Sequence, residues 1–447
     1  MGGCAHDSDY VRPVAPVPAQ WPAAAAVGAD GKVASMQWKS YFKDPILQSL
    51  VEQALANNRD LKLAASRVLE ARAQFGLAKA DTKPSINTTI SGASIGTPAD
   101  LSGTGSSTST KRFDVSVGVS NFELDVWGRL AGLADAARDS YLATEDTRRA
   151  VQLGLIADVA SAYYALLQAQ ELVELTKDLI DARLETLRLV EKGRDIGGTY
   201  GLEVEQASSA LEASRASLDG MLHQERQAFN RLSYLIGYST VPNVLSRPLP
   251  RASTLEVVAV GVPSNALLAR PDVLAAELRL KAAHANVDAA RAAFLPKILL
   301  TSSLGFASQA LGSLFGGGAW SFQPALNFPL FDGGRLNASK DLAEARRVVA
   351  VADYERTIQQ AFREVADLLS SKKSLLAQAN AAAGQLRSIE LRYKIAEARY
   401  AGGMVSYLDV LEARRELIGA REMDIQLRRA QLETSAQLFK ALGGFIA

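Results

Sequence analysis

The sequence predicts a mainly α-helical, internally duplicated chain in which each copy carries a β-hairpin. Prolines are absent between Pro98 and Pro242 and again after Pro329. Proline destabilises a helix interior by about 3 kcal/mol, so these two tracts are where uninterrupted helices can form. The two halves also repeat at a fixed offset, and each half contains stretches in which apolar and polar residues alternate.

Very long helices are expected in both proline-free tracts, over about 129–192 and about 335–400. The first tract consists chiefly of helix-forming residues, and its apolar side chains recur on one face at helical spacing. This face includes Val151, Leu155, Val159, Ala162 and Leu166. At 1.5 Å per residue each helix would be about 95–100 Å long, far above the norm for a globular domain. Such helices belong in a coiled coil or a tube.

A tandem duplication relates the two halves. An offset of 206 residues (328 − 122) relates FELDVWGRL, which begins at Phe122, to FPLFDGGRL, which begins at Phe328. An offset of 212 residues (271 − 59) relates RDLKLAASRVLEARA, at Arg59, to PDVLAAELRLKAAHA, at Pro271. The segment between these blocks is therefore six residues longer in the first copy. A repeat of this size indicates that each half is one structural unit.

The repeat sets the expected domain boundaries. We expect an extended arm over 1–45, a first repeat over 46–237, a linker over 238–262 and a second repeat over 263–447. The first repeat comprises a helix, a β-hairpin at about 84–126, the long helix at about 129–192 and a helix at about 199–235. The second comprises a helix, a β-hairpin at about 296–331, the long helix at about 335–400, a helix at about 404–442 and the C-terminal end.

Alternation predicts the strands of each hairpin. Apolar residues occupy alternate positions in RFDVSVGVS and WSFQPALNF, and PSINTTISG and PKILLTSSLG supply the partner strands. The Gly/Ser/Thr-rich segments TPADLSGTGSSTSTK and SQALGSLFGGG are expected as solvated loops. One apolar and one polar face suit the wall of a barrel that faces lipid.

Four strands per chain leave two interpretations open. They are too few to close a barrel that has an interior, and an open sheet edge is not tolerated in lipid. The sheet is therefore either soluble with exposed edges or shared by several chains. Three chains would give twelve strands, an even number within the range of outer-membrane barrels.

Composition excludes several classes of protein. The net charge is +1, so global electrostatics predict no nucleic-acid partner. No CxxC, HExxH, GxSxG or phosphate-loop motif is present, and the three histidines are far apart, so no catalytic residue, metal ligand or cofactor is predicted.

The single cysteine, Cys4, follows two glycines in MGGCAHDS. This context resembles a bacterial lipoprotein cleavage site, in which the cysteine receives diacylglycerol and an N-acyl chain, although a chance N-terminal cysteine explains it equally. Ala5, where such lipoproteins can carry Asp, favours export to the outer membrane. The following YVRPVAPVPAQWP is proline-rich and predicts an extended arm.

Two carboxylates, Asp409 and Glu412, follow a glycine pair in GGMVSYLDVLEARRE. Their spacing places them on one face, one helical turn apart. Taken alone, this spacing favours an ordinary solvated helix start, where the helix dipole stabilises acids.

Several motifs together resemble the TolC-like outer-membrane efflux channels, in the lipoprotein branch that serves resistance-nodulation-division (RND) pumps. They cover nearly the whole chain: QWKSYFKDPILQSLVEQALANNRDL, FELDVWGRL, ALLARPDVLAAE, ANVDAARAAFLPKILLTSSLG, FREVADLL and LFKALGG.

The resemblance implies a homotrimer, with a twelve-stranded transmembrane β-barrel above a long α-helical periplasmic tunnel. It implies a lipid-anchored arm at 1–45, a belt that includes the 238–262 linker, and a site in the bacterial outer membrane, in contact with its lipid. The channel would conduct passively, receiving drugs or other toxic compounds from a periplasmic adaptor and an inner-membrane RND-type pump.

The resemblance also assigns a periplasmic gate. The family's VDVLDA pattern, here LDVLEA, forms an acidic constriction, which would be made by Asp409 and Glu412. Tyr400 matches the tyrosine that ties the closed tip, and Glu203, at offset 206 from Asp409, matches its acidic partner. Arg415 matches an arginine that pairs near the constriction.

Two features of this gate are specific to the chain. Leu408 is expected to form an apolar ring beside the carboxylates. Val405 departs from members that place an arginine there, so the closed state is expected to have fewer polar ties.

Two other functions remain open at this point. Within the same fold, the cargo could be heavy-metal cations, although the five methionines are dispersed rather than clustered. Outside the fold, a soluble coiled-coil scaffold with two small hairpins would explain the helices but not the alternating aromatic strands.

Overall fold

The structure, a computed structural model, describes residues 10–18, 37–103, 105–196, 201–238, 247–251 and 264–444. The chain divides into two compact units. The sheet unit comprises Met1–Val14, Arg67–Glu145 and Ala275–Glu355, and the core unit comprises Ala15–Ser66, Asp146–Leu274 and Arg356–Ala447. Cys4 and most of the predicted 238–262 linker lie outside the described residues.

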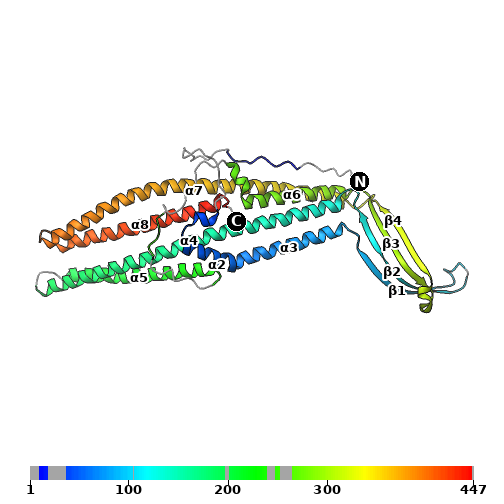
Figure 1. Ribbon diagram of the computed structural model, residues 1–447, viewed down its shortest axis with the longest axis horizontal. Coiled ribbons are helices and arrows are strands. Elements are labelled where there is room, and N and C mark those ends of the chain that lie inside the picture. The colour runs from blue at the N-terminus through cyan, green and yellow to red at the C-terminus, as the bar shows by residue number, and fades with distance from the viewer. Residues whose placement is uncertain are drawn as a thin grey trace. The chain divides into compact units, whose positions relative to one another are not determined.

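The predicted fold class is confirmed: the described chain is mainly helical with one four-stranded antiparallel sheet (Figure 1). The elements in chain order are α1 (Trp38–Tyr41), α2 (Pro45–Asn57), α3 (Arg59–Asp81), β1 (Ile86–Thr97), β2 (Thr108–Leu124), α4 (Arg129–Asp195), α5 (Gly201–Leu235), η2 (Ser264–Ala269), α6 (Pro271–Ala292), β3 (Lys297–Ser308), η3 (Leu311–Gly316), β4 (Gly318–Asn327), α7 (Arg335–Ala401) and α8 (Tyr407–Ala441).

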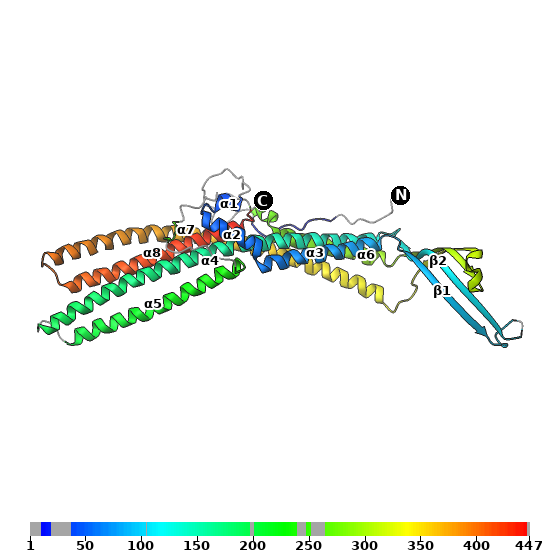
Figure 2. The same cartoon turned by 60° about the horizontal axis from the view of Figure 1, so that its bottom comes forward.

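The duplication is visible in the helix boundaries themselves. Helices α4 and α7 each have 67 residues, α5 and α8 each have 35, and each pair begins 206 residues apart (335 − 129 and 407 − 201). Helices α4 and α5 run side by side, as do α7 and α8, in both Figure 1 and Figure 2. At 1.5 Å per residue, α4 and α7 are each about 100 Å long.

The same local device starts both long helices. Asp125 accepts hydrogen bonds from the backbone N–H groups of Leu130 (3.0 Å) and Ala131 (2.7 Å). Asp332 accepts hydrogen bonds from Gly334 (3.0 Å) and Leu336 (2.7 Å). Each carboxylate therefore satisfies amide groups that a helix start would leave without partners, and it lies at the positive end of the helix dipole.

Among the described helices, α4 alone is long and apolar enough to cross a membrane by composition, but 61% of its most apolar window is buried inside the protein. A buried core helix meets the same criterion, and burial of this extent indicates that role for α4.

The sheet has the order β1-β2-β3-β4, and every neighbouring pair is antiparallel. The cross-strand row Thr88, Val117, Leu304 and Trp320 lies on one face, which is apolar and exposed; Trp320 retains 77% of its surface. The next row, on the opposite face, consists of small and polar residues: Thr89, Ser116, Gly305 and Ala319. Strands β1 and β4 are the edges, and each has one side without a partner strand among the described residues.

Two sequence expectations for the strands were wrong in detail. Residues 108–111 belong to β2, although the Ser/Thr-rich sequence predicted a loop there, because they pair in register with β1 as far as Thr97. Phe328, expected on the apolar face of the last strand, lies beyond the end of β4 at Asn327.

Two glycines allow β2 and β3 to approach closely at the centre of the sheet. A Cβ atom on Gly305 would lie 2.0 Å from the carbonyl oxygen of Val115, and one on Gly118 would lie 2.1 Å from that of Ser302. Neither distance leaves room for a side chain, so only glycine fits at these two positions.

The core unit is built around aromatic side chains. Tyr41, Phe42 and Phe439 contact one another with ring centroids 4.9–5.5 Å apart. Tyr41 donates a hydrogen bond to the carbonyl of Ser435 (2.9 Å), and the Tyr163 hydroxyl donates to Asp44 (2.8 Å). The polar end of each of these buried tyrosines is therefore satisfied.

Each copy fastens the end of its 35-residue helix to the start of its short helix. In the first copy, buried Asn58 donates to the carbonyl of Leu235 (2.9 Å) and accepts from the N–H of Leu61 (3.0 Å). In the second, buried Arg270 donates to the carbonyl of Ala441 (2.6 Å) and pairs with Asp272 and Glu364. The offsets of 212 and 206 make these contacts equivalent.

The described part of the linker is held by a charged contact. The Leu249 N–H donates to Glu171 (3.0 Å), and its carbonyl accepts from Arg428 (2.7 Å). Arg428 and Glu171 are themselves paired at 2.6 Å. This three-residue contact fixes residues 247–251 against α4 and α8.

We predict that Gly305→Ala lowers the free energy of unfolding by at least about 1–3 kcal/mol, the usual effect of overpacking, because β2 and β3 must separate to admit the methyl group. Denaturant unfolding followed by circular dichroism would measure the effect. Gly96→Ala in β1 is the matched control, since its Cβ would meet no atom within 4 Å. Equal stability of the two variants would contradict the close approach.

Candidate functional site

The predicted site residues gather at one end of the core unit, where α4 ends and α5 begins and where α7 ends and α8 begins (Figure 2). A glycine cap ends α7: Gly403, at φ +70°, donates its N–H to the carbonyl of Tyr400 (2.9 Å), and the Met404 N–H donates to that of Arg399 (2.9 Å). This pair of bonds is the Schellman motif, and it explains why a glycine is needed here. It also sets the position of Tyr400 in the last turn of α7.

Asp409 has a local role that its sequence spacing anticipated. Its Oδ2 accepts hydrogen bonds from the Ser406 backbone N–H (2.9 Å) and hydroxyl (2.7 Å), while the Asp409 N–H donates to the Ser406 hydroxyl (3.4 Å). Together these contacts form a capping box at the start of α8. The carboxylate is exposed and stabilises the helix start.

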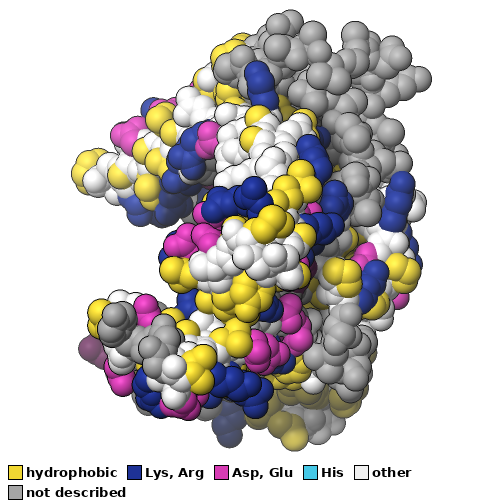
Figure 3. All heavy atoms as spheres, turned by 90° about the vertical axis from the view of Figure 1, so that its left-hand side faces the viewer, with side chains coloured by type: hydrophobic (Ala, Val, Ile, Leu, Met, Phe, Trp, Pro, Cys, Tyr) yellow, Lys and Arg dark blue, Asp and Glu magenta, His cyan; other side chains and the backbone are white. Residues whose placement is uncertain are grey.

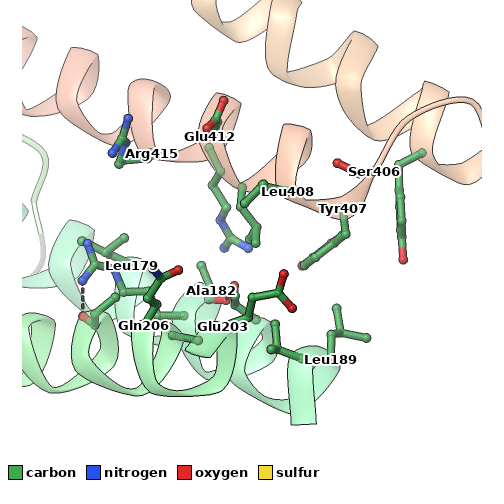
Figure 4. A pocket seen from close by; sticks show the side chains of 18 residues that line it. Leu179, Ala182, Leu189, Glu203, Gln206, Ser406, Tyr407, Leu408, Glu412 and Arg415 are labelled. Carbon is green, nitrogen blue, oxygen red and sulfur yellow. Dashed lines mark hydrogen bonds between the residues drawn. The ribbon is translucent and has the colours of Figure 1, made fainter. Parts of the chain in front are cut away.

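A cavity of about 860 Å³ lies between the α4–α5 pair and the α7–α8 pair. Five of the six predicted gate residues line it, and Asp409 is not among them: Glu203, Tyr400, Leu408, Glu412 and Arg415. In Figure 4, Leu408 and Tyr407 point from α8 toward α4 and α5, and the Glu412 carboxylate lies on the side of α8 turned away from them. The structure thus brings residues from all four helices to one cavity.

Two predicted contacts are absent within this chain. No hydrogen bond joins the described residues Tyr400 and Glu203, and no ion pair joins the described residues Glu412 and Arg415. Glu412 and Arg415 are both exposed.

Aromatic packing, which the sequence did not indicate, joins the two sides of the turn. The rings of Tyr400 and Tyr407 lie 5.0 Å apart at an interplanar angle of 55°. Burial raises the pKa of Tyr407. Its equivalent at offset 206 is Gly201, so a comparison of the two copies would have revealed Tyr407 as a difference.

Arg183 is the second site residue that sequence reasoning missed. It lines the cavity from α4 and donates a hydrogen bond to the carbonyl of Ala210 on α5. Burial lowers the pKa of its guanidinium, and the nearby positive charge of Arg415 lowers it further. Its equivalent at offset 206 is Ile389, a second place where the copies differ.

Charges of both signs are mixed over this end of the molecule. Figure 3 shows lysine and arginine interspersed with aspartate, glutamate and hydrophobic side chains on this face. The described residues contain no group of three or more His, Cys, Asp or Glu side chains arranged to hold a metal ion. Within one chain, the arrangement can orient charges and resist or allow separation of the helix pairs.

Comparisons with known proteins agree with this architecture. A family described as outer membrane efflux protein matches the chain twice, over residues 50–238 and 262–444. The two matches correspond to the two copies of the duplication.

Individual relatives match over almost the full length. The chain is 40% identical over 451 residues both to the antibiotic efflux pump outer membrane protein ArpC of Pseudomonas putida and to the toluene efflux pump outer membrane protein TtgC of the same species. In each case 99% of this chain and 93% of the relative are covered. A crystal structure of a membrane protein from Pseudomonas aeruginosa is similar at a TM-score of 0.90 and 36% identity, covering 98% of this chain and 100% of that one.

We predict that Ser406→Ala lowers the free energy of unfolding by about 1 kcal/mol, because it removes the hydroxyl that caps the start of α8. Amide hydrogen exchange at Tyr407–Asp409 should become faster. Ser388→Ala, on an exposed position within α7, is the control, since its hydroxyl bonds only to the carbonyl of Gly384. Unchanged exchange in the first turn of α8 would contradict the capping role.

Proposed function

Because this chain belongs to the outer membrane efflux protein family, we propose that it forms the outer-membrane channel of a tripartite efflux system and conducts small toxic compounds passively to the exterior. The family is one of outer membrane transport proteins, not of enzymes. An outer membrane location also removes the soluble coiled-coil scaffold from consideration.

The single observation that carries the proposal is the open four-stranded sheet with an exposed apolar face. Unpaired strand edges cannot face hydrocarbon, so β1 of one chain must pair with β4 of another. Three chains then close a barrel of twelve strands, with the apolar row of Trp320 toward lipid and the small, polar row of Ser116 toward the interior. The long helices continue this ring as a tunnel.

The cargo is proposed from the relatives. Two proteins 40% identical to this chain are named for the efflux of antibiotics and of toluene. Both names indicate small organic compounds, so we assign this class to the channel. A periplasmic adaptor and an inner-membrane RND-type pump would deliver the cargo and supply the energy.

The gate is proposed at the end of the core unit. Three-fold repetition would place three Asp409 and three Glu412 carboxylates around the axis. Both hydrogen bonds to Asp409 use Oδ2, so Oδ1 remains available to the pore. A ring of carboxylates favours cations and resists anions. Leu408 would add an apolar ring.

Tyr400 and Glu203 are proposed to hold the tip shut. Both line the cavity between the helix pairs, so a small approach of the pairs would allow the tyrosine hydroxyl to donate to the carboxylate. Arg415 would find its carboxylate partner in the same closed arrangement. Opening would then require the helix pairs to separate at this cavity.

The N-terminal arm is proposed to carry the lipid anchor. Diacylglycerol and an N-acyl chain on Cys4 would hold the arm in the outer membrane in addition to the barrel. No other cofactor and no nucleic-acid partner is proposed.

We predict that Asp409→Asn combined with Glu412→Gln reduces cation selectivity, because it neutralises six charges in the trimer. Reversal potentials in planar bilayers under a salt gradient would measure this. The control Asp219→Asn with Glu212→Gln removes the same number of charges from exposed positions on α5. If the reversal potential of the tip variant stays at the wild-type value, the two carboxylates do not line the pore.

We predict that Tyr400→Phe combined with Glu203→Gln raises the single-channel conductance, because it removes the hydrogen bond proposed for the closed tip. Tyr393→Phe is the control, since its hydroxyl bonds within α7 to Glu397 (2.5 Å). Currents equal to those of the wild type would count against the proposed tie.

A further inference from the structure

The N-terminal arm is fixed to α6 by a charged contact. Arg12 donates two hydrogen bonds to the Glu277 carboxylate, from Nε at 3.0 Å and from Nη2 at 2.6 Å. Glu277 is 4% exposed, and Lys281 lies 3.4 Å from its other side. A buried carboxylate that is held by a two-bond guanidinium pair gives this contact a defined geometry.

Tyr10 makes the second contact of the arm with α6. The ammonium of Lys281 lies 5.2 Å from the centroid of the Tyr10 ring, and the His284 ring meets it edge-on at 6.1 Å. Burial raises the pKa of Tyr10 to about 12, with a further contribution from the negative charge of Glu277. The hydroxyls of Tyr10 and of Tyr354 on α7 are both buried, so the arm also approaches α7.

These contacts give the arm a direction. Arg12 contacts α6 at Glu277, and Tyr10 contacts it at Lys281 and His284, so the arm runs antiparallel to α6. The chain before Tyr10 therefore heads toward the C-terminal end of α6, at Ala292, and toward the start of β3, at Lys297.

Chain length limits how far the N-terminus can reach. From His284 to the end of α6 is eight residues, or about 12 Å. From Tyr10 back to Cys4 is six residues, which span at most about 20 Å when extended. Cys4 can therefore come level with the start of β3 but can extend little beyond it.

Exposed apolar residues mark the membrane boundary at this level. Phe328, Leu330 and Phe331 follow β4 directly and are exposed, Phe331 to 92%. Nearby, the Trp127 Nε1 donates to the carbonyl of Pro296, immediately before β3 (2.8 Å). Exposed aromatic residues at strand ends are typical of the boundary between hydrocarbon and head groups.

We propose that Tyr10 and Arg12 form a clamp on α6 that sets the height at which the N-terminus enters the lipid, so that acyl chains on Cys4 insert at the level of the strand ends. The proposal rests on the acylation of Cys4 put forward above. The clamp determines where the anchor can act, and a displacement of one helical turn along α6 would move it by about 5.4 Å.

The first test measures the clamp without reference to acylation. Tyr10→Ala combined with Arg12→Ala should accelerate amide hydrogen exchange at Val11, residue 12 and Val14 by at least about tenfold, because the arm detaches from α6. Glu277→Gln should produce part of this effect, since the pair loses its charge. Val11→Ala with Val14→Ala is the matched control, because both side chains are exposed. Exchange in the double variant equal to that of the wild type would overturn the clamp.

The second test measures the height of the anchor. A spin label at Ser8→Cys, in the full-length trimer in vesicles of phosphatidylethanolamine and phosphatidylglycerol, reports depth through its accessibility to oxygen and to a water-soluble nickel chelate. We expect one narrow depth in the wild type and a broad distribution in the Tyr10/Arg12 variant. An unchanged depth, with faster exchange, would show that the arm contact has no role in anchoring.

Mass spectrometry of the N-terminal peptide separates this inference from the function on which it rests. Unmodified Cys4 in protein from the native outer membrane would reject acylation, and with it the anchoring role, while the exchange result would still decide whether the clamp exists.

Discussion

Backbone hydrogen bonding at the two edges of the four-stranded sheet is the constraint on which the rest of the structure depends. β1 and β4 each present a row of N–H and C=O groups with no partner in the described chain, and lipid offers no hydrogen bonds to replace it. The apolar row of Val117, Leu304 and Trp320 faces outward on the same sheet, so the chain can neither leave lipid nor close alone. Sharing the sheet among copies satisfies both demands, and the duplicated helices then repeat around the same axis.

Duplication supplies the scaffold, and the differences between the copies supply the specific features. The contact that fastens each 35-residue helix is a neutral amide, Asn58, in the first copy and a buried guanidinium, Arg270, in the second. Arg270 also reaches Glu364 on α7 (2.9 Å), so one side chain holds three helices of the second copy together. At the tip, Tyr407 and Arg183 likewise have no equivalent in the other copy. Positions at which the copies diverge are therefore where the two helix pairs acquire separate roles.

Capping and gating are compatible at Asp409 because they use different atoms. The capping box with Ser406 occupies Oδ2 and directs the carboxylate along the start of α8, which fixes the side chain before any copy of the chain is added. A fixed carboxylate is a better element of a charged ring than a mobile one, since its position does not have to be ordered at the moment an ion passes. The local stability of the helix start and the proposed selectivity of the channel thus depend on the same residue.

The sequence by itself determined the helices, the hairpins and the duplication, because these follow from local features: proline-free tracts, alternation, and an offset of 206 residues that recurs in the boundaries of α4 and α7. It also located the tip residues, since the turn at Gly402–Gly403 places them in order. Tertiary structure alone decided the pairing of β2 with β3, the packing of Tyr407 on Tyr400, the Arg183 contact and the clamp of Arg12 on Glu277. These contacts join residues far apart in the chain or across a turn, and no local pattern encodes which side chains meet when distant segments pack.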